Sequence, residues 1–279
     1  MKKPLVSILA HTRNSERTIK AHLKSIIAQS YKPIEIIMVD NNSTDNTVVI
    51  AKGFTKNIFA YGPERSAQRN FGAKKAKGDY LLVPDSDMIL GKNVVKECVS
   101  LALKDPNIKA VIIPEKSIGT NFWAKCKQLE RSYYPGIDWI EGARFFQKKI
   151  FNEIGGYDEK NTGTEDLDFP QRIIRMFGKK STGRIREYIY HDEGSLSFFY
   201  LLKKKFYYAQ NLDVYKKTNL SSYDKQADIL RRFSIFFSNP VKLFNNPLVG
   251  IGMLFMKTCE FAAGGLGYLF KRKINVYGS

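Results

Sequence analysis

The sequence has few of the residues that build cross-linked or zinc-stabilised domains. Its three cysteines, Cys98, Cys126 and Cys259, lie far apart and form no C-x-x-C pair. Neither a disulfide framework nor a zinc site is therefore predicted, and a reducing compartment is expected. The first residues also lack the long apolar run and small-residue cleavage site of a secretory signal, so we interpret "PLVSILA" as a first strand.

Acidic residues are also in short supply. The chain has 45 Lys and Arg against 27 Asp and Glu, a formal net charge of +18. This balance favours an anionic partner, such as nucleic acid, an anionic membrane surface or a phosphorylated substrate, although it could also serve only solubility. The 279 residues, 43% of them hydrophobic, suffice for one large domain or one domain with an appendage.

Strand-length apolar runs alternate with helical patterns over residues 4–115. One such helix places Ile19, Leu23, Ile26 and Ile27 on one face. No internal repeat or low-complexity linker interrupts this half. The alternation predicts an α/β fold, a mostly parallel sheet covered by helices on both faces. The predicted strands are "PLVSILA", "IEIIMVD", "NIFAYG", "YLLVPDSD" and "KAVIIPE".

Carboxylates end two of these predicted strands. Asp40 ends "IEIIMVD", and Asp85 and Asp87 follow "YLLVP" with Ser86 between them. Because ligands bind beyond the carboxyl ends of parallel strands, these acids should face one crevice. An isolated D-x-D is more often a capped turn, but in this position it suits a hard divalent cation that holds a diphosphate.

In the order and spacing of its motifs, the chain resembles the family-2 glycosyltransferases of GT-A fold. The motifs span residues 4 to about 195; only Ala10 and His11 depart from them, standing where a proline is common. The resemblance implies a Rossmann-like sheet, a UDP- or GDP-type sugar donor, a divalent cation (Mn²⁺ or Mg²⁺) and inversion at the transferred sugar. The matching stretches are a first strand ending near residues 12–14, "VDNNSTDNT", "AQRNFGAKKAKGDYLLVPDSD", "GGYDE" and the "ED" pair.

The resemblance also implies which residues bind the nucleotide sugar. Asp40 would bind the nucleobase, with Thr12 near it, and Arg69 would lie near the nucleotide or organise the acids. Asp85 would contact ribose or metal, and Asp87 would be the firmer metal ligand. The full expected set is Thr12, Asp40, Arg69, Asp85, Ser86 and Asp87.

Glu165 and Asp166 open a predicted helix, where the helix dipole stabilises carboxylates, so they could simply be a cap and first-turn acids. The resemblance implies instead that one of them is the catalytic base, and that it is the second acid, Asp166. It would deprotonate an acceptor hydroxyl as that oxygen attacks the anomeric carbon opposite the leaving group.

Four further residues are weaker candidates. His191 is either structural or a third contact to metal or diphosphate, and as a ligand it would favour manganese over magnesium. Trp139, Glu141 and Gly142 are expected to line the sugar and acceptor pocket, although Trp139 could equally be a core residue.

The C-terminal part differs in composition, which predicts a catalytic domain over 1–215 and a basic, aromatic, helical extension over 216–279. Residues 247–270 are apolar enough to test as a membrane span, but Lys257 and Glu260 interrupt them. Each charge at mid-membrane costs roughly 2.5–3.5 kcal/mol. We therefore expect an amphipathic helix or helical hairpin at the cytoplasmic, inner face of a membrane, with a homodimer interface as the alternative.

Several functions remain open at this point. The first is transfer to a hydroxyl of a lipid-linked polyprenyl saccharide, an acceptor used by many members of the family. The second is transfer to polyprenyl phosphate itself, which needs no base because that nucleophile is already an anion. A basic nucleic-acid-binding protein ranks low because it leaves the strand-end acids unexplained, and no nucleic acid partner is expected. A membrane-tethered scaffold is disfavoured because every expected acid is present.

Overall fold

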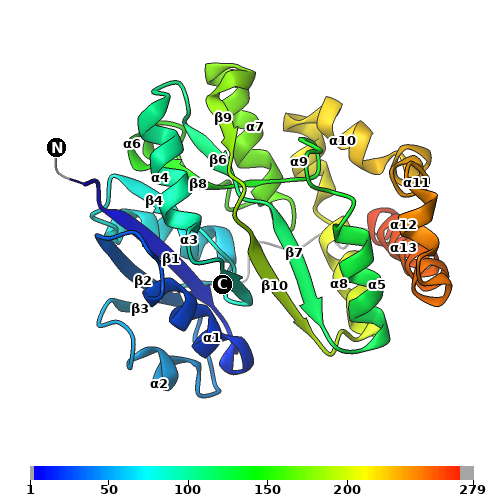
Figure 1. Cartoon of the computed structure of the whole chain (residues 1–279), viewed down its shortest axis with the longest axis horizontal. Coiled ribbons are helices and arrows are strands. Elements are labelled where there is room, and N and C mark those ends of the chain that lie inside the picture. Colours follow the sequence, from blue (N-terminus) through cyan, green and yellow to red (C-terminus); the bar gives the residue numbers. More distant parts are fainter. Residues whose placement is uncertain (1–2, 271–279) are drawn as a thin grey trace.

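The computed structural model describes residues 3–270, which form a twisted sheet with helices on both faces and a layer of helices beside it (Figure 1). The seven-stranded sheet has the order β3-β2-β1-β4-β8-β6-β9, and only β8 is antiparallel to its neighbours. Its strands are β1 (Val6–Thr12), β2 (Ile34–Asp40), β3 (Ile58–Ala60), β4 (Tyr80–Leu82), β6 (Ala110–Ile112), β8 (Ala143–Gln147) and β9 (Thr182–Arg184).

Helices cover both faces of this sheet, because its inner strand β1 is buried on both sides. All seven residues of β1 are buried. Val6 and Ile8 pack toward one core, and Leu9 packs toward the other. The predicted α/β fold is confirmed. The surrounding helices are α1 (Glu16–Ile27), α2 (Thr47–Ala51), α3 (Arg65–Lys75), α4 (Val94–Lys104), α6 (Lys148–Glu153) and α7 (Glu165–Phe177), followed by a short 3-10 turn, Lys179–Ser181.

A second, three-stranded sheet was not predicted. It has the order β5-β10-β7 and is formed by β5 (Met88–Leu90), β10 (Ile189–Gly194) and β7 (Glu115–Gly119). The predicted strand "YLLVPDSD" is longer than β4, which ends at Leu82. Asp85 forms an isolated parallel bridge with His11 of β1, and Asp87 lies in the turn before β5. Within this sheet His191 pairs with Met88, next to Asp87.

The remaining helices form what we call the helical layer. Figure 1 shows it at the end of the molecule far from α2, with α13 against α8 and α5. Because α5 and α8 precede residue 215, the predicted extension packs on part of the predicted catalytic domain. The layer contains α5 (Phe122–Arg131), α8 (Phe198–Ala209), α9 (Leu212–Thr218), α10 (Leu220–Ala227), α11 (Ile229–Phe237), α12 (Pro240–Phe244) and α13 (Pro247–Leu269).

Helix α13 is one continuous helix, so the alternative of a hairpin within it was wrong. By length and composition alone it could cross a membrane, a test that core helices of soluble proteins also pass. Its two charged residues are buried in an ion network with α5: Lys257 Nζ lies 2.6 Å from both Glu130 and Glu260. Lys127 Nζ lies 2.7 Å from Glu130 and 3.0 Å from Glu260. The basic stretch "KRK" at 271–273, which follows α13 in the sequence, lies outside the described residues.

Candidate active site

A cleft of about 790 Å³ lies beyond the carboxyl ends of β1, β2 and β4. We call it the strand-end cleft. Its floor includes Thr12, Asn41 and the acid turn Asp85–Asp87, and helix α8 contributes Tyr200 and several lysines. The sequence predicts a crevice faced by Asp40, Asp85 and Asp87, and only Asp85 and Asp87 line this cleft.

Asp40, the expected nucleobase ligand, lies beside this cleft and not in its lining. It is 4% exposed. Its carboxylate accepts hydrogen bonds from Thr12 Oγ1 at 2.8 Å and from the Ser43 backbone N–H at 2.8 Å. As the side chains stand, Asp40 holds the turn after β2, whereas Thr12 and Asn41 face the cleft.

Asp85 is held by basic side chains. Its Oδ1 lies 2.7 Å from Arg69 Nη2 and 3.1 Å from His11 Nε2, and its Oδ2 lies 3.3 Å from Arg144 Nη2. Burial favours the neutral acid, but Arg144 and Arg69 outweigh it and hold the pKa of Asp85 well below its usual range. Burial, with Arg69, lowers the pKa of His11 to about 4, so His11 is neutral near pH 7.

Asp87 is freer than Asp85. Its Oδ2 lies 3.2 Å from His191 Nε2, and its Oδ1 is buried without a hydrogen-bond partner. On the other side of the ring, His191 Nδ1 lies 2.9 Å from Arg131 Nη1 and 3.9 Å from Glu115 Oε2. Ser86, between the acids, has its hydroxyl 3.0 Å from that of Ser15.

These contacts bear on the predicted cation. Among residues 3–270, no three His, Cys, Asp or Glu side chains gather into a complete metal site. Asp87 nevertheless fits a cation that arrives with a nucleotide. Burial and Arg131 lower the pKa of His191, but Asp87 and Glu115 outweigh them and raise it to about 9, so His191 would join as a ligand only after a cation replaced its proton. Such an ion takes one or two protein ligands and completes its shell with phosphate oxygens and water. The Oδ1 of Asp87 has no hydrogen-bond partner, so this oxygen is available to bind such an ion.

The acid pair that opens α7 contains two different environments. Glu165 is buried, with Arg65 Nε at 2.6 Å and Arg69 Nη1 at 3.1 Å. Burial and the neighbouring Asp166 raise the pKa of Glu165. The Asp166 side chain is 26% exposed; its Oδ1 lies 2.6 Å from Arg69 Nη1 and its Oδ2 3.8 Å from Arg144 Nη2. Only Asp166 has an oxygen free to meet a substrate.

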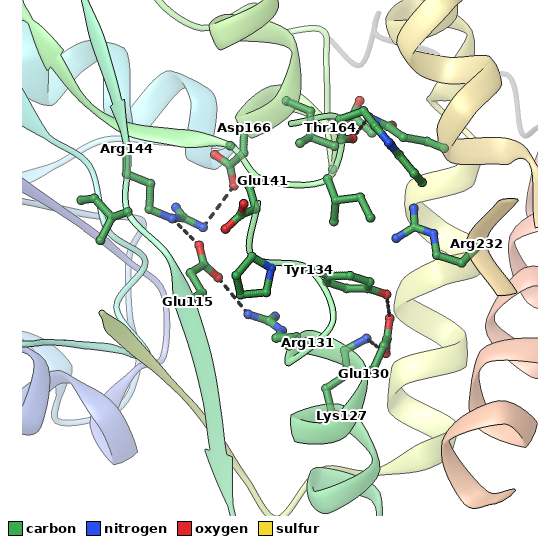
Figure 2. Close-up of a pocket in the computed structure, with 18 of the residues that line it drawn as sticks. Glu115, Lys127, Glu130, Arg131, Tyr134, Glu141, Arg144, Thr164, Asp166 and Arg232 are labelled. Atoms are coloured by element: carbon green, nitrogen blue, oxygen red, sulfur yellow. Dashed lines mark hydrogen bonds and ion pairs between the residues drawn. The ribbon is translucent and has the colours of Figure 1, made fainter. Parts of the chain in front are cut away.

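Asp166 also lines a second cavity, of about 410 Å³, which we call the helix-side cavity (Figure 2). Trp139, Glu141 and Gly142, which the sequence predicts to line one pocket, line this cavity too. Glu141 is ion-paired with Arg184. Gly142 lacks a side chain because a Cβ there would lie 2.5 Å from the Asp166 carbonyl oxygen.

Arg69 joins the two acid motifs. It is 0% exposed and contacts Asp85, Glu165 and Asp166 but lines neither cavity. It therefore organises the acids in this structure and does not face the strand-end cleft. Three basic residues that also shape the site were not predicted as site residues. His11 stood out only as a departure from the first-strand motif, and Arg131 and Arg144 come from segments without a motif.

Comparison with known proteins gives this arrangement a family. The model of "Glycosyl transferase family 2" matches residues 7–176. Glycosyltransferase GlyG of Streptococcus pneumoniae is 31% identical over 237 residues, 81% of this chain and 75% of that protein. An uncharacterized glycosyltransferase of Rickettsia typhi is 28% identical over 190 residues, 62% of this chain and 59% of that protein. The chain thus spans less than two thirds of the length of some relatives.

Solved structures share the fold. The mannosyltransferase PcManGT of Pyrobaculum calidifontis, in complex with GDP-Man and Mn²⁺, superposes with a TM-score of 0.66 at 13% identity, covering 98% of this chain and 89% of that one. Glucosyl-3-phosphoglycerate synthase of Mycobacterium tuberculosis, in complex with Mn²⁺ and UDP, gives 0.53 at 15% identity, covering 75% and 78%. The chain belongs to glycosyltransferase family 2 and has the GT-A fold.

Proposed function

We propose that this glycosyltransferase moves a sugar from a UDP- or GDP-type donor to a hydroxyl acceptor, with inversion. The observation that carries the proposal is the position of Asp166, which lines both the strand-end cleft and the helix-side cavity. A base at this junction can take the proton of a hydroxyl that enters from one cavity, while that hydroxyl oxygen attacks the anomeric carbon of a sugar held in the other.

The donor is proposed to lie in the strand-end cleft. Thr12 and Asn41 would lie beside the nucleobase, with Asp40 supporting them from behind. Asp87 and His191 would hold Mn²⁺ or Mg²⁺, which would neutralise charge on the leaving diphosphate. Asp85, already paired with arginines, would orient ribose or the cation's water.

The acceptor is proposed to enter through the helix-side cavity. Asp166 Oδ2 takes the hydroxyl proton, while Arg69 fixes Oδ1 and so orients the carboxylate. The acceptor oxygen, as it loses its proton, attacks the anomeric carbon from the side opposite the diphosphate. The bond to the nucleoside diphosphate breaks as the new bond forms, so this single displacement inverts the sugar configuration. Residues 1–215 would supply all these groups, and Arg232 and Lys257 of the region 216–279 would complete the cavity wall.

The donor site can be tested by calorimetric titration with UDP and GDP, each with Mn²⁺ and with EDTA. Asp87→Ala is expected to weaken Mn²⁺-dependent nucleotide binding by at least about tenfold. It removes the carboxylate that, unlike that of Asp85, is not paired with arginines and can bind the ion. Asp192→Ala is the matched control, since Asp192 lies on β10 near His191 but pairs with Arg17 outside the cleft. Binding that is equal with Mn²⁺ and EDTA would contradict a metal-held diphosphate.

We further propose that the protein acts at the inner face of a membrane, on a lipid-linked saccharide. Large apolar side chains of the helical layer support this: Leu230 is 83% exposed, Val241 81% and Leu248 75%. Exposed apolar side chains flanked by lysine and arginine are typical of proteins that bind an anionic membrane surface.

Vesicle co-sedimentation tests this attachment. The pair Leu230→Ser and Val241→Ser is expected to lower partition onto anionic vesicles roughly 100-fold, because burying each of the two side chains contributes about 1.5 kcal/mol or more. Val49→Ser is the control, since Val49 is 67% exposed on α2 at the far end of the molecule. Unchanged partition together with loss of a dimer in light scattering would instead identify a homodimer interface.

A further inference from the structure

The helix-side cavity contains more positive than negative charge. Most of its cations are neutralised by carboxylates within 4 Å, including the Lys257 and Lys127 network with α5 described above. Two cations that line it, Lys205 and Arg232, form no such ion pair among the described residues. The paired cations are Lys127, Arg131, Arg144 and Lys257, with Glu115, Glu130, Asp166 and Glu260 among their partners.

Arg232 is buried despite its missing partner. It is 9% exposed, and its Nε is buried without a hydrogen-bond acceptor. Its guanidinium carbon lies 5.3 Å from the ring centre of Tyr134 and 5.0 Å from that of Trp139. Figure 2 shows it projecting into the cavity from the side opposite Arg144. The rings hold the guanidinium in place, but burying an unpaired charge is costly, so the site is suited to an anion.

Lys205 lies on α8 and lines both cavities. The Glu260 carboxylate favours the charged form of Lys205. Burial and the nearby Lys127 and Lys257 outweigh that effect and lower the pKa of Lys205 to about 8. An anion in the cavity would restore the balance of charge around this ammonium group.

We propose that the helix-side cavity binds an anionic group of the acceptor, a phosphate or carboxylate, between Arg232 and Lys205. The inference rests on the proposed function, because it assigns the acceptor to this cavity. A guanidinium presents paired N–H donors that match such a group, which makes Arg232 the main contact. With the anion anchored there, the rest of the acceptor can extend across the cavity toward Asp166. The anion could belong to a lipid headgroup or to a soluble acceptor.

Trp139 provides a direct reporter for this site. In a Trp123→Phe background, Trp139 is the single tryptophan, and Trp123 itself packs in the helical layer away from both cavities. We expect inorganic phosphate, titrated in EDTA, to change Trp139 fluorescence saturably. Adding Arg232→Gln should weaken the apparent affinity roughly tenfold or more, since it removes a charge-assisted contact. Calorimetry on the same proteins checks that the effect is binding and not only altered fluorescence.

Arg231→Gln is the matched control, because Arg231 is the neighbouring arginine on α11, its side chain is 48% exposed, and it faces Asp228. It should leave phosphate affinity unchanged. Phosphatidylcholine vesicles with and without phosphatidic acid form the second arm. An Arg232-dependent response confined to phosphatidic acid vesicles identifies a lipid headgroup, and a response to free phosphate alone identifies a soluble acceptor.

Either Arg232-dependent response supports the proposal. Equal phosphate affinity with and without Arg232→Gln, or no saturable response to either probe, overturns it. Binding of UDP or GDP with Mn²⁺ is measured on every variant. Failure of the unchanged protein to bind nucleotide would count against the proposed glycosyl transfer, whereas intact nucleotide binding with Arg232-independent phosphate binding would count against this inference alone.

Discussion

Replacing Asp166 by Asn is expected to lower the rate of sugar transfer by about 10²- to 10⁴-fold, the usual contribution of a general base. The amide has nearly the same shape but cannot take the acceptor proton. Donor binding should persist, because Asp87 and His191 remain in place. Release of nucleoside diphosphate from a donor sugar, measured with a lipid extract as acceptor source, reports the rate, and calorimetry with UDP or GDP reports donor binding.

The control for this variant is Glu159→Gln, which removes an exposed acid from the loop before α7, outside both cavity linings. It should transfer sugar at the rate of the unchanged protein. Full activity of Asp166→Asn would contradict a base at this position. If that activity appeared with polyprenyl phosphate as acceptor, the second functional alternative would be favoured, because an anionic nucleophile needs no deprotonation.

The largest expected effect on stability comes from the buried ion network between α5 and α13. Lys257→Met should lower the free energy of unfolding by about 3–5 kcal/mol, because it leaves Glu130 and Glu260 buried with Lys127 as their remaining close cation. The double change Lys257→Met with Glu260→Leu removes one charge of each sign and should recover most of the loss. Denaturant unfolding of the two variants measures both values.

Acid provides an independent check on the same network. Burial favours protonation of Glu260, but Lys127 and Lys257 outweigh it and lower its pKa to about 2, from 4.5. Because the folded-state pKa is lower, the carboxylate stabilises the fold above the ordinary pKa, and this contribution is lost as pH falls from about 4.5 toward 2. A Glu260→Leu variant with Lys257→Met should lose less stability over that range. An equal loss would mean that other groups dominate acid unfolding.

The main sheet could be predicted because each of its longer strands can be recognised from a short stretch of the sequence. The runs around Val6–Thr12 and Ile34–Asp40 are apolar and flanked by helical patterns, which suffices to order strands and helices. The second sheet could not be predicted in this way. β5 has three residues, and β10 carries polar residues such as His191, so neither shows a strand period of useful length. Their pairing depends on contacts between segments about a hundred residues apart.

In the candidate active site, too, some features could be predicted from the sequence and others appear only in the folded structure. Motifs identify Asp85, Asp87 and Asp166, but only packing shows that Asp85 is enclosed by arginines while Asp87 keeps a free oxygen. Sequence reasoning favoured Asp166 over Glu165 by resemblance alone, and the structure adds a physical difference, since Glu165 is buried between two arginines. Arg232 had no sequence signal because its role depends on the aromatic rings of Tyr134 and Trp139, which lie in the segment after α5.

The contact between α5 and α13 has a consequence for how the molecule is made. Lys127 and Glu260 are 133 residues apart in the chain. During synthesis the main sheet can acquire its strands while α13 is still untranslated, because domains assemble as their segments emerge and distant contacts form late. Until then Lys127 and Glu130 lack their partners on α13. The helix-side cavity is therefore completed after the strand-end cleft, and a nascent chain would be able to hold a nucleotide before it could hold an acceptor.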